Sequence, residues 1–384
     1  MESTAAIFMT GATGQLGSFI LADLLGFTGR PAHPGPIYCA SRTSSSFEQL
    51  EMTASFLGLE SHTLHKHPQV RWISLDLLNH HEAITALPAQ DHQWEIIHAA
   101  AVIDVNQGTS GTNPNVRLTQ EVLLLAEALN AQHFNHISSI AVMGNAATLD
   151  EETVLEVADF QPNKSKDSLG TYAKSKILSE LEVWRAHQEG MSISIIRPGV
   201  IVGMGPISAS PQELWWRLWH KKLPISTDGR TGIVDVRDVA EIVGRAHRER
   251  LQGPFVAVGS NPEFHELLTR MRDALGRDQK LRPLNRDPWL RRMRALDSLK
   301  HLPVVGRFFG ASMRIMLFSR NTYNGESGAA LLENGYRPAE QTFQEMGGCH
   351  ARGLRKGIKK TRFFRTGFLR LKQNSCYALG TTLT

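Results

Sequence analysis

The sequence predicts an α/β fold with a parallel, doubly wound central sheet. Short apolar runs alternate with segments whose apolar residues recur every three or four positions, and this alternation persists over the first two thirds of the chain. Strands and helices in strict alternation produce parallel strands with helices on both faces. The 384 residues, 41% of them hydrophobic, suffice for one large domain with a smaller appendage.

Six apolar runs are predicted to be the strands of this sheet. In chain order they are residues 5–9, 37–40, 70–75, 96–99, 134–138 and 192–197. The segments between them with the clearest helical period are residues 17–25, 116–131 and 172–189. Residues 27–36, rich in proline and glycine, are predicted to form a long loop. Right-handed crossovers then place a ligand crevice at the carboxyl ends of the strands.

A glycine-rich loop, TGATGQLG at residues 10–17, follows the first predicted strand and opens the first helix. Gly11 permits a tight turn, Gly14 lets the backbone approach a pyrophosphate, and Gly17 allows close packing of helix on strand. Backbone amides and the positive end of the helix then face the anion. We therefore predict a dinucleotide site of the Rossmann type that contains Gly11, Thr13, Gly14, Gln15, Leu16 and Gly17.

The end of the second predicted strand indicates which dinucleotide binds. Its sequence has no acidic residue where one would hydrogen-bond an adenosine ribose; Ser41 and Arg42 stand there instead. Both can contact a 2′-phosphate, which favours NADP (NADPH), with NAD as the alternative. An exposed arginine that begins a loop is the competing interpretation of Arg42. Asp76, beside Leu77 after the third strand, is predicted to contact the adenine; alternatively it caps a helix.

Tyr172 and Lys176 lie four residues apart in a predicted helix and hence on one face of it. A tyrosine hydroxyl with a pKa near ~10 becomes an acid–base catalyst at neutral pH when a nearby cation lowers that pKa. This spacing alone is common. Upstream, a predicted strand ends in Ser138 and Ser139, and a serine hydroxyl there can hold a carbonyl oxygen beside the tyrosine.

Taken together, these motifs resemble those of the extended short-chain dehydrogenase/reductase superfamily, which includes NAD-dependent epimerases and dehydratases. The resemblance covers residues 5 to about 260. Its segments, in order, are TGATGQLG, IIHAAA, HISSIAVMG, GTYAKSK and RPGVIVG.

The resemblance implies roles for individual residues. Tyr172 corresponds to the proton donor or acceptor, and Lys176 to the partner that lowers its pKa and anchors the ribose. Ser139 corresponds to the hydroxyl that positions the carbonyl, because the family's serine lies three positions before the valine of SSxxV, here Val142. The further cofactor-lining positions that it implies are Ala99, Ala100, Ala101, Asn115, Ser138, Pro198, Gly199 and Val200.

Within the superfamily, the segments look most like reductase domains that act on thioesters or fatty acyl groups. Met143 stands where many sugar-modifying members carry tyrosine, which weakens a nucleotide-sugar interpretation. We therefore expect an NADPH-dependent oxidoreductase that reduces a ketone, aldehyde or acyl thioester of an apolar substrate. The alternatives are a 3β-hydroxysteroid-like or nucleotide-sugar dehydrogenase or epimerase, and a non-catalytic cofactor-binding scaffold or sensor.

The alternation weakens after about residue 206, which predicts three parts. A Rossmann NAD(P)-binding domain comprises residues 1–205 with a contribution from 230–260, a substrate-binding subdomain comprises 206–229 and 261–345, and a basic amphipathic tail comprises 346–384. Three tryptophans of the second part would line an apolar pocket or pack in its core; they are Trp215, Trp216 and Trp219.

Positive charge is concentrated in residues 351–384, which hold nine lysines or arginines and no acidic residue. Removing these nine charges from the net +5 leaves −4 for the rest of the chain. Interleaved phenylalanines and leucines make this segment either a solvated tail or a surface for an anionic membrane or an acyl carrier protein. Nucleic acid is disfavoured, and a homodimer is left open.

Cysteine and histidine spacing argues against a metal site. The three cysteines lie far apart without CxxC spacing, which excludes a structural zinc motif and suits a reducing compartment. His62, His65 and His67 lie close together, but neither paired carboxylates nor a second histidine pair accompany them, so we predict a solvated loop. Without a signal sequence or a run of ~18 apolar residues, the expected location is cytoplasmic, with peripheral membrane association as the alternative.

Overall fold

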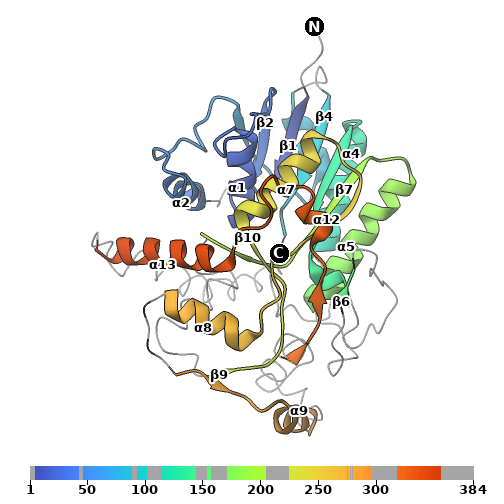
Figure 1. Ribbon diagram of the computed structural model, residues 1–384. Coiled ribbons are helices and arrows are strands. Elements are labelled where there is room, and N and C mark those ends of the chain that lie inside the picture. The colour runs from blue at the N-terminus through green and yellow to red at the C-terminus, as the bar shows by residue number, and fades with distance from the viewer. Residues whose placement is uncertain are drawn as a thin grey trace, which may run out of the picture.

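A parallel sheet of seven strands forms the centre of the computed structural model (Figure 1). The structure describes residues 5–42, 46–88, 93–101, 114–143, 154–156, 171–204, 225–295 except 275, 277 and 279, and 318–355. The strands are β1 (Ala6–Thr10), β2 (Ile37–Ser41), β3 (Val70–Ser74), β4 (Trp94–His98), β5 (His133–Ile137), β7 (Ile193–Pro198) and β11 (Gly253–Ala257). Their order in the sheet is β11-β7-β5-β4-β1-β2-β3, which confirms the predicted fold class.

The central strands are covered on both faces, and this explains their sequences. Every residue of β1, β4, β5 and β7 is buried, as expected for parallel strands that read as continuous apolar runs. The six predicted strands agree with the observed ones to within one or two residues at each end. The seventh, β11, lies in the segment 230–260 that the sequence assigned to this domain, but it was not among the predicted strands.

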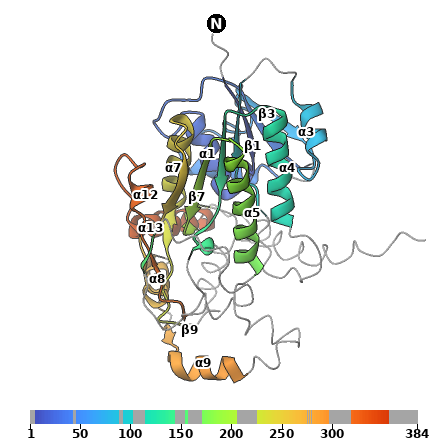
Figure 2. The same ribbon diagram turned by 90° about the vertical axis from the view of Figure 1, so that its right-hand side faces the viewer.

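Helices pack on the two faces of the sheet. One face carries α1 (Gln15–Leu24), α2 (Glu48–Phe56) and α7 (Val236–Arg248), which share one apolar core with the strands. The other carries α3 (His80–Ala86), α4 (Pro114–Ala128) and α5 (Thr171–Gln188) around a second core, and Figure 2 shows α4 and α5 side by side there.

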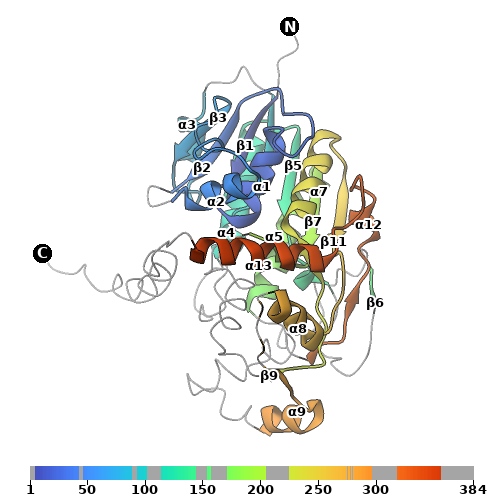
Figure 3. The same cartoon turned by 60° about the vertical axis from the view of Figure 1, so that its left-hand side comes forward.

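Smaller elements gather beyond the carboxyl ends of the strands, where β9, α8 and α9 lie (Figures 1 and 3). Three two-stranded parallel pairs join β10 to β8, β12 to β9 and β13 to β6. The bounds of all these elements are η1 (Ile140–Val142), β6 (Val154–Leu155), β8 (Val200–Val202), β9 (Ile225–Ser226), β10 (Ile233–Asp235), α8 (Phe264–Ala274), β12 (Arg282–Pro283), α9 (Arg286–Ala295), β13 (Thr322–Tyr323), α12 (Glu326–Ala329) and α13 (Ala339–Arg355).

Some predicted features lie outside the described residues, and one predicted boundary lies within a helix. Trp215, Trp216 and Trp219 lie outside the described residues, as does the tail from residue 356 onward. The boundary expected between residues 345 and 346 falls inside α13. None of the helices in the described ranges combines the length and hydropathy that crossing a bilayer requires.

A buried carboxylate ties α1 to α7. Asp23 on α1 is fully buried, and its Oδ1 accepts a hydrogen bond from Arg30 at 2.6 Å. Its Oδ2 accepts one from Arg248 on α7 at 2.8 Å. Arg30 also pairs with Glu241, a second acid on α7. The pairing of buried acids with guanidinium groups therefore fixes the contact between helices that are more than 200 residues apart in the chain.

Replacing Asp23 by alanine should lower the free energy of unfolding by about 3 kcal/mol, because the partly buried Arg248 loses the Asp23 carboxylate and Arg30 keeps its pair with Glu241 but loses Asp23. Denaturant unfolding measures the loss. The matched control is Glu249→Ala, which breaks the exposed Arg245–Glu249 pair on α7 and should cost at most about 0.5 kcal/mol. Equal losses in the two variants would contradict the structural role of Asp23.

Candidate active site

The glycine loop between β1 and α1 is packed too closely for side chains. Gly11 has a φ of +78°, in the left-handed region, and a Cβ there would lie 2.6 Å from the carbonyl carbon of Ala99. A Cβ on Gly17 would lie 2.1 Å from the carbonyl oxygen of Gly11. Both contacts are with backbone, which cannot rotate away. The loop therefore sits directly against the segment that follows β4.

The start of α1 is suited to an anion. In the described structure Gly14 caps this helix without a side-chain hydrogen bond, and the first turn contains no acidic residue. The amide groups and the positive helix end are thus not opposed by a local negative charge. Thr13 is half-buried in the loop, Leu16 packs on the core, and the Gln15 amide donates to the Gly203 carbonyl at 3.2 Å. These features fit a dinucleotide pyrophosphate.

The predicted adenosine-binding residues share the carboxyl edge of the sheet. Met9 of β1 pairs with Cys39 of β2, so Ser41 and Arg42 end β2 level with the glycine loop. Ser41 is half-buried and Arg42 is exposed. This position allows Arg42 to meet a ribose substituent from the solvent side.

Asp76 forms a turn after β3 and does not cap the next helix. Its Oδ1 accepts from the backbone N–H of Leu78 at 3.0 Å, while Leu77 packs on the core. The N-cap of α3 is Asn79, whose side chain accepts from the Glu82 amide. The helix-cap interpretation of Asp76 is therefore wrong, and its exposed carboxylate lies at the sheet edge.

Short hydrogen bonds fix the remaining predicted cofactor-lining segments. After β4, the Ala100 amide donates to the Thr10 hydroxyl at 3.1 Å; its neighbours Ala99 and Ala101 are half-buried and exposed respectively. Pro198, buried at the end of β7, precedes Gly199, whose amide donates to the Ala257 carbonyl at 2.9 Å. The Val200 amide donates to Gly232 at 2.7 Å, and a Cβ on Gly199 would lie 2.6 Å from that same carbonyl oxygen.

Asn115 connects α4 with the helix that carries the predicted catalytic pair. Its side-chain amide donates to the Ser175 hydroxyl at 3.2 Å, and that hydroxyl donates to the Tyr172 carbonyl at 2.8 Å. Asn115 is buried, so this link is shielded from water. It holds the first turn of α5 against α4.

The Ser139 side chain lies beside the Tyr172 phenol, where η1 packs against α5. Ser139 follows β5 and caps η1, where its hydroxyl accepts from the Ala141 amide at 3.2 Å. Burial raises the pKa of the Tyr172 phenol, and the Ser139 hydroxyl offsets part of that rise. At neutral pH the phenol is therefore protonated, as a proton donor must be.

Lys176 differs from expectation in its effect on the tyrosine. Its buried ammonium donates to the Ile137 carbonyl at 2.9 Å. Burial lowers the pKa of Lys176 to about 8, with Glu180 acting in the opposite direction. We expected Lys176 to lower the pKa of Tyr172, but in the structure burial dominates and raises it. The lysine keeps most of its charge at neutral pH one helical turn from the phenol.

A buried ion pair lies under these residues, and the sequence analysis missed it. The Glu180 carboxylate accepts from Arg197 at 2.5 Å and from the Ser138 hydroxyl at 2.5 Å, and all three residues are buried. The Ser138 hydroxyl is thus already used by Glu180, whereas Ser139 lies beside Tyr172. This arrangement favours Ser139 over Ser138 as the hydroxyl that would position a carbonyl. The signal available in the sequence was the four-residue spacing of Tyr172, Lys176 and Glu180 on one helix face.

A family model described as "Male sterility protein", an NAD-binding family, matches residues 9–229. The L-2-aminoadipate reductase large subunit of Eremothecium gossypii is 30% identical over 219 residues, covering 53% of this chain and 16% of that protein. Aldehyde reductase lnaA of Aspergillus flavus is 29% identical over 228 residues, covering 56% of this chain and 21% of that protein. The chain therefore aligns with about a fifth or less of either relative.

Solved structures share the fold over nearly the whole chain. The terminal R domain from the myxalamid PKS-NRPS pathway superposes with a TM-score of 0.66 at 18% identity, covering 94% of this chain and 93% of that one. A thiolation-reductase di-domain from an archaeal non-ribosomal peptide synthetase gives 0.64 at 16% identity, with 91% and 75% covered. At these identities the likeness concerns the fold alone.

Gly17→Ala and Gly14→Ala should separate packing from cofactor contact. At Gly17 the new Cβ meets backbone at 2.1 Å, so both the unfolding temperature and the affinity for NADPH should fall. At Gly14 the nearest atom is 3.2 Å away and φ is −88°, so stability should change little while affinity falls at least about tenfold because the added methyl group blocks the pyrophosphate. Thermal unfolding and fluorescence titration measure the two effects. Unchanged affinity in both variants would refute this phosphate site.

Proposed function

The chain belongs to the NAD-binding family described as male sterility protein and is an oxidoreductase of the reductase type, and on this premise we propose that it uses NADPH to reduce the carbonyl of an apolar substrate. The observation that carries the proposal is the position of Ser139 beside Tyr172 where η1 packs on α5, with Lys176 one turn further along that helix and held on the Ile137 carbonyl. This set lies at the carboxyl end of β5, on the same sheet edge as the glycine loop.

Each of these side chains has a distinct task in the proposed reaction. The nicotinamide, when bound, supplies a hydride to the carbonyl carbon. Ser139 donates a hydrogen bond to the carbonyl oxygen and holds it beside the phenol. Tyr172 transfers its proton to that oxygen as negative charge develops there. The Lys176 ammonium stabilises the phenolate that remains and binds a ribose hydroxyl.

An acyl thioester is the substrate class that we favour. The relatives include aminoadipate and aldehyde reductases, and one structural neighbour joins a thiolation unit to a reductase. An acyl carrier protein would then present the thioester, and the basic tail from residue 346 would bind that acidic partner or an anionic membrane. We further propose that residues 206–229 and 261–345 cover the substrate.

A panel of substrates tests the proposal directly. Purified full-length protein is mixed with NADPH and with acyl thioesters, aldehydes, ketones or nucleotide sugars, and NADPH oxidation is followed by absorbance. We expect turnover with an acyl thioester or its aldehyde product. Cofactor binding without turnover on any carbonyl would favour a scaffold, and conversion of nucleotide sugars alone would favour an epimerase or dehydrogenase.

Tyr172→Phe should lower turnover about 10²- to 10⁴-fold with NADPH binding largely kept, because only the proton-donating hydroxyl is lost. Steady-state kinetics and binding titrations measure the two effects. Tyr38→Phe is the matched control, because it removes a phenol hydroxyl from a ring that packs on Trp94 in the second core. Turnover of Tyr172→Phe above about a tenth of the wild-type value would exclude the proton-transfer role.

Arg42→Asp should reverse or abolish a preference for NADPH over NADH. The native protein should bind NADPH more tightly by about 1.5–3 kcal/mol, the contribution of a charge-assisted phosphate contact. The introduced carboxylate would repel the 2′-phosphate and accept ribose hydroxyls instead. Titration with both cofactors gives the ratio of the two dissociation constants. Equal dissociation constants of the native protein for NADPH and NADH would contradict the proposed contact of Arg42 with the 2′-phosphate.

A further inference from the structure

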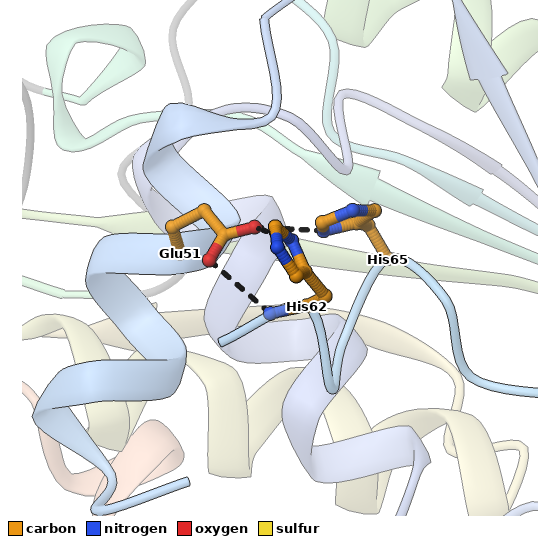
Figure 4. Close-up of side chains that lie close together, drawn as sticks. All are labelled: Glu51, His62 and His65. Atoms are coloured by element: carbon orange, nitrogen blue, oxygen red, sulfur yellow. Dashed lines mark hydrogen bonds and ion pairs between the residues drawn. The ribbon is translucent and has the colours of Figure 1, made fainter. Parts of the chain in front are cut away.

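Two histidines and a glutamate converge on the surface between α2 and β3 (Figure 4). Glu51 lies on α2, and His62 and His65 lie on the segment that leads from α2 to β3. The Glu51 Oε1 atom is 2.5 Å from His62 Nδ1 and 3.2 Å from His65 Nδ1. One oxygen and two nitrogens thus lie within 4.8 Å of one another.

The two oxygens of the Glu51 carboxylate have separate surroundings. Oε2 accepts from the Ser61 hydroxyl and from the His62 backbone N–H, the latter at 3.2 Å. Oε1 faces the two imidazoles. Hydrogen bonds to one oxygen orient the carboxylate and leave the other as the ligand atom, an arrangement that supports metal ligands in proteins.

His65 is held in place by contacts that do not use its Nδ1 atom. Its ring stacks on Phe47 with centroids 4.9 Å apart and planes 2° apart, and its carbonyl accepts from Trp72 Nε1 at 2.8 Å. Its Nδ1 is buried and faces the Glu51 Oε1 atom, its polar neighbour at 3.2 Å. The ring is therefore fixed with this nitrogen directed at the cluster.

The backbone of the segment that carries the two histidines is strained at the cluster. His62 adopts a φ of +69°, a conformation that costs energy for a residue with a side chain. Such conformations recur at ligand sites.

We propose that Glu51, His62 and His65 bind one first-row transition-metal dication, with Zn²⁺ as the best fit. Two imidazole nitrogens and one carboxylate oxygen suit zinc better than the oxygen-seeking Mg²⁺ or Ca²⁺, and water completes the tetrahedron. The sequence predicted no metal here, because neither paired carboxylates nor a second histidine pair accompany these histidines. Glu51 comes from the preceding helix, and the third histidine is engaged elsewhere, since His67 Nδ1 accepts from the Gln69 amide.

The metal would connect α2 to the segment before β3 on the outside of the domain. Phe47, the ring against which His65 stacks, immediately precedes α2 and follows the end of β2 by six residues. The proposed role is therefore structural support of this corner, independent of the chemistry at Tyr172.

Metal binding to tag-free full-length protein tests the proposal after chelator treatment. We expect one Zn²⁺ per chain by calorimetry, and a visible absorption spectrum of four-coordinate Co²⁺ that Zn²⁺ abolishes. Glu51→Gln, His62→Ala and His65→Ala should each weaken Zn²⁺ binding at least about tenfold. His80→Ala is the matched control, because it removes a histidine paired with a glutamate at 2.7 Å, outside the cluster, and should bind as the wild type does.

Thermal unfolding with and without Zn²⁺ supplies a second measurement. Zn²⁺ should raise the unfolding temperature of the wild type and of His80→Ala but not of the three cluster variants. If a cluster variant fails to fold, paramagnetically shifted histidine resonances of the Co²⁺-loaded wild type still identify the ligands. Absence of stoichiometric binding, or wild-type affinity in a His62→Ala/His65→Ala double variant, overturns the proposal.

Discussion

The buried ion pair between Glu180 and Arg197 is the constraint on which the candidate site depends. Both charges are removed from water, so each requires the other, and breaking such a pair costs far more than forming it gains. Since Glu180 lies on α5 and Arg197 on β7, their contact sets the height of α5 over the sheet. Tyr172 and Lys176 precede Glu180 on the same helix face, and the engaged Ser138 leaves Ser139 beside the phenol.

The features that the sequence predicted well are those encoded locally. Six strands and three helices were visible as continuous apolar runs and helical periods, and the glycine loop was recognisable because its glycines follow a strand and open a helix. The strand β11 was missed because its five residues, GPFVA, begin with glycine and proline and carry little strand signal.

The features that it missed depend on partners brought together by folding. In the sequence, Glu180 is one more polar residue on a helix, and only the fold places Arg197 against it. Glu51 likewise resembles a solvated acid, because His62 and His65 come close to it only through the fold of the loop. The direction of the pKa shift of Tyr172 likewise depends on residues that only folding brings together. Spacing reveals the neighbouring lysine, but desolvation arises from the elements packed around the phenol, and it is the largest cause of the raised pKa of Tyr172.

The contact between α1 and α7 has a consequence for how this domain can be isolated. The matched family region ends at residue 229, before α7 and β11, although both complete the sheet and its first core. A fragment cut at that limit would leave Asp23 without Arg248 and would expose the apolar face of α1. The folding unit is therefore longer than the matched family region and extends at least to β11, the strand at which the chain returns to the sheet.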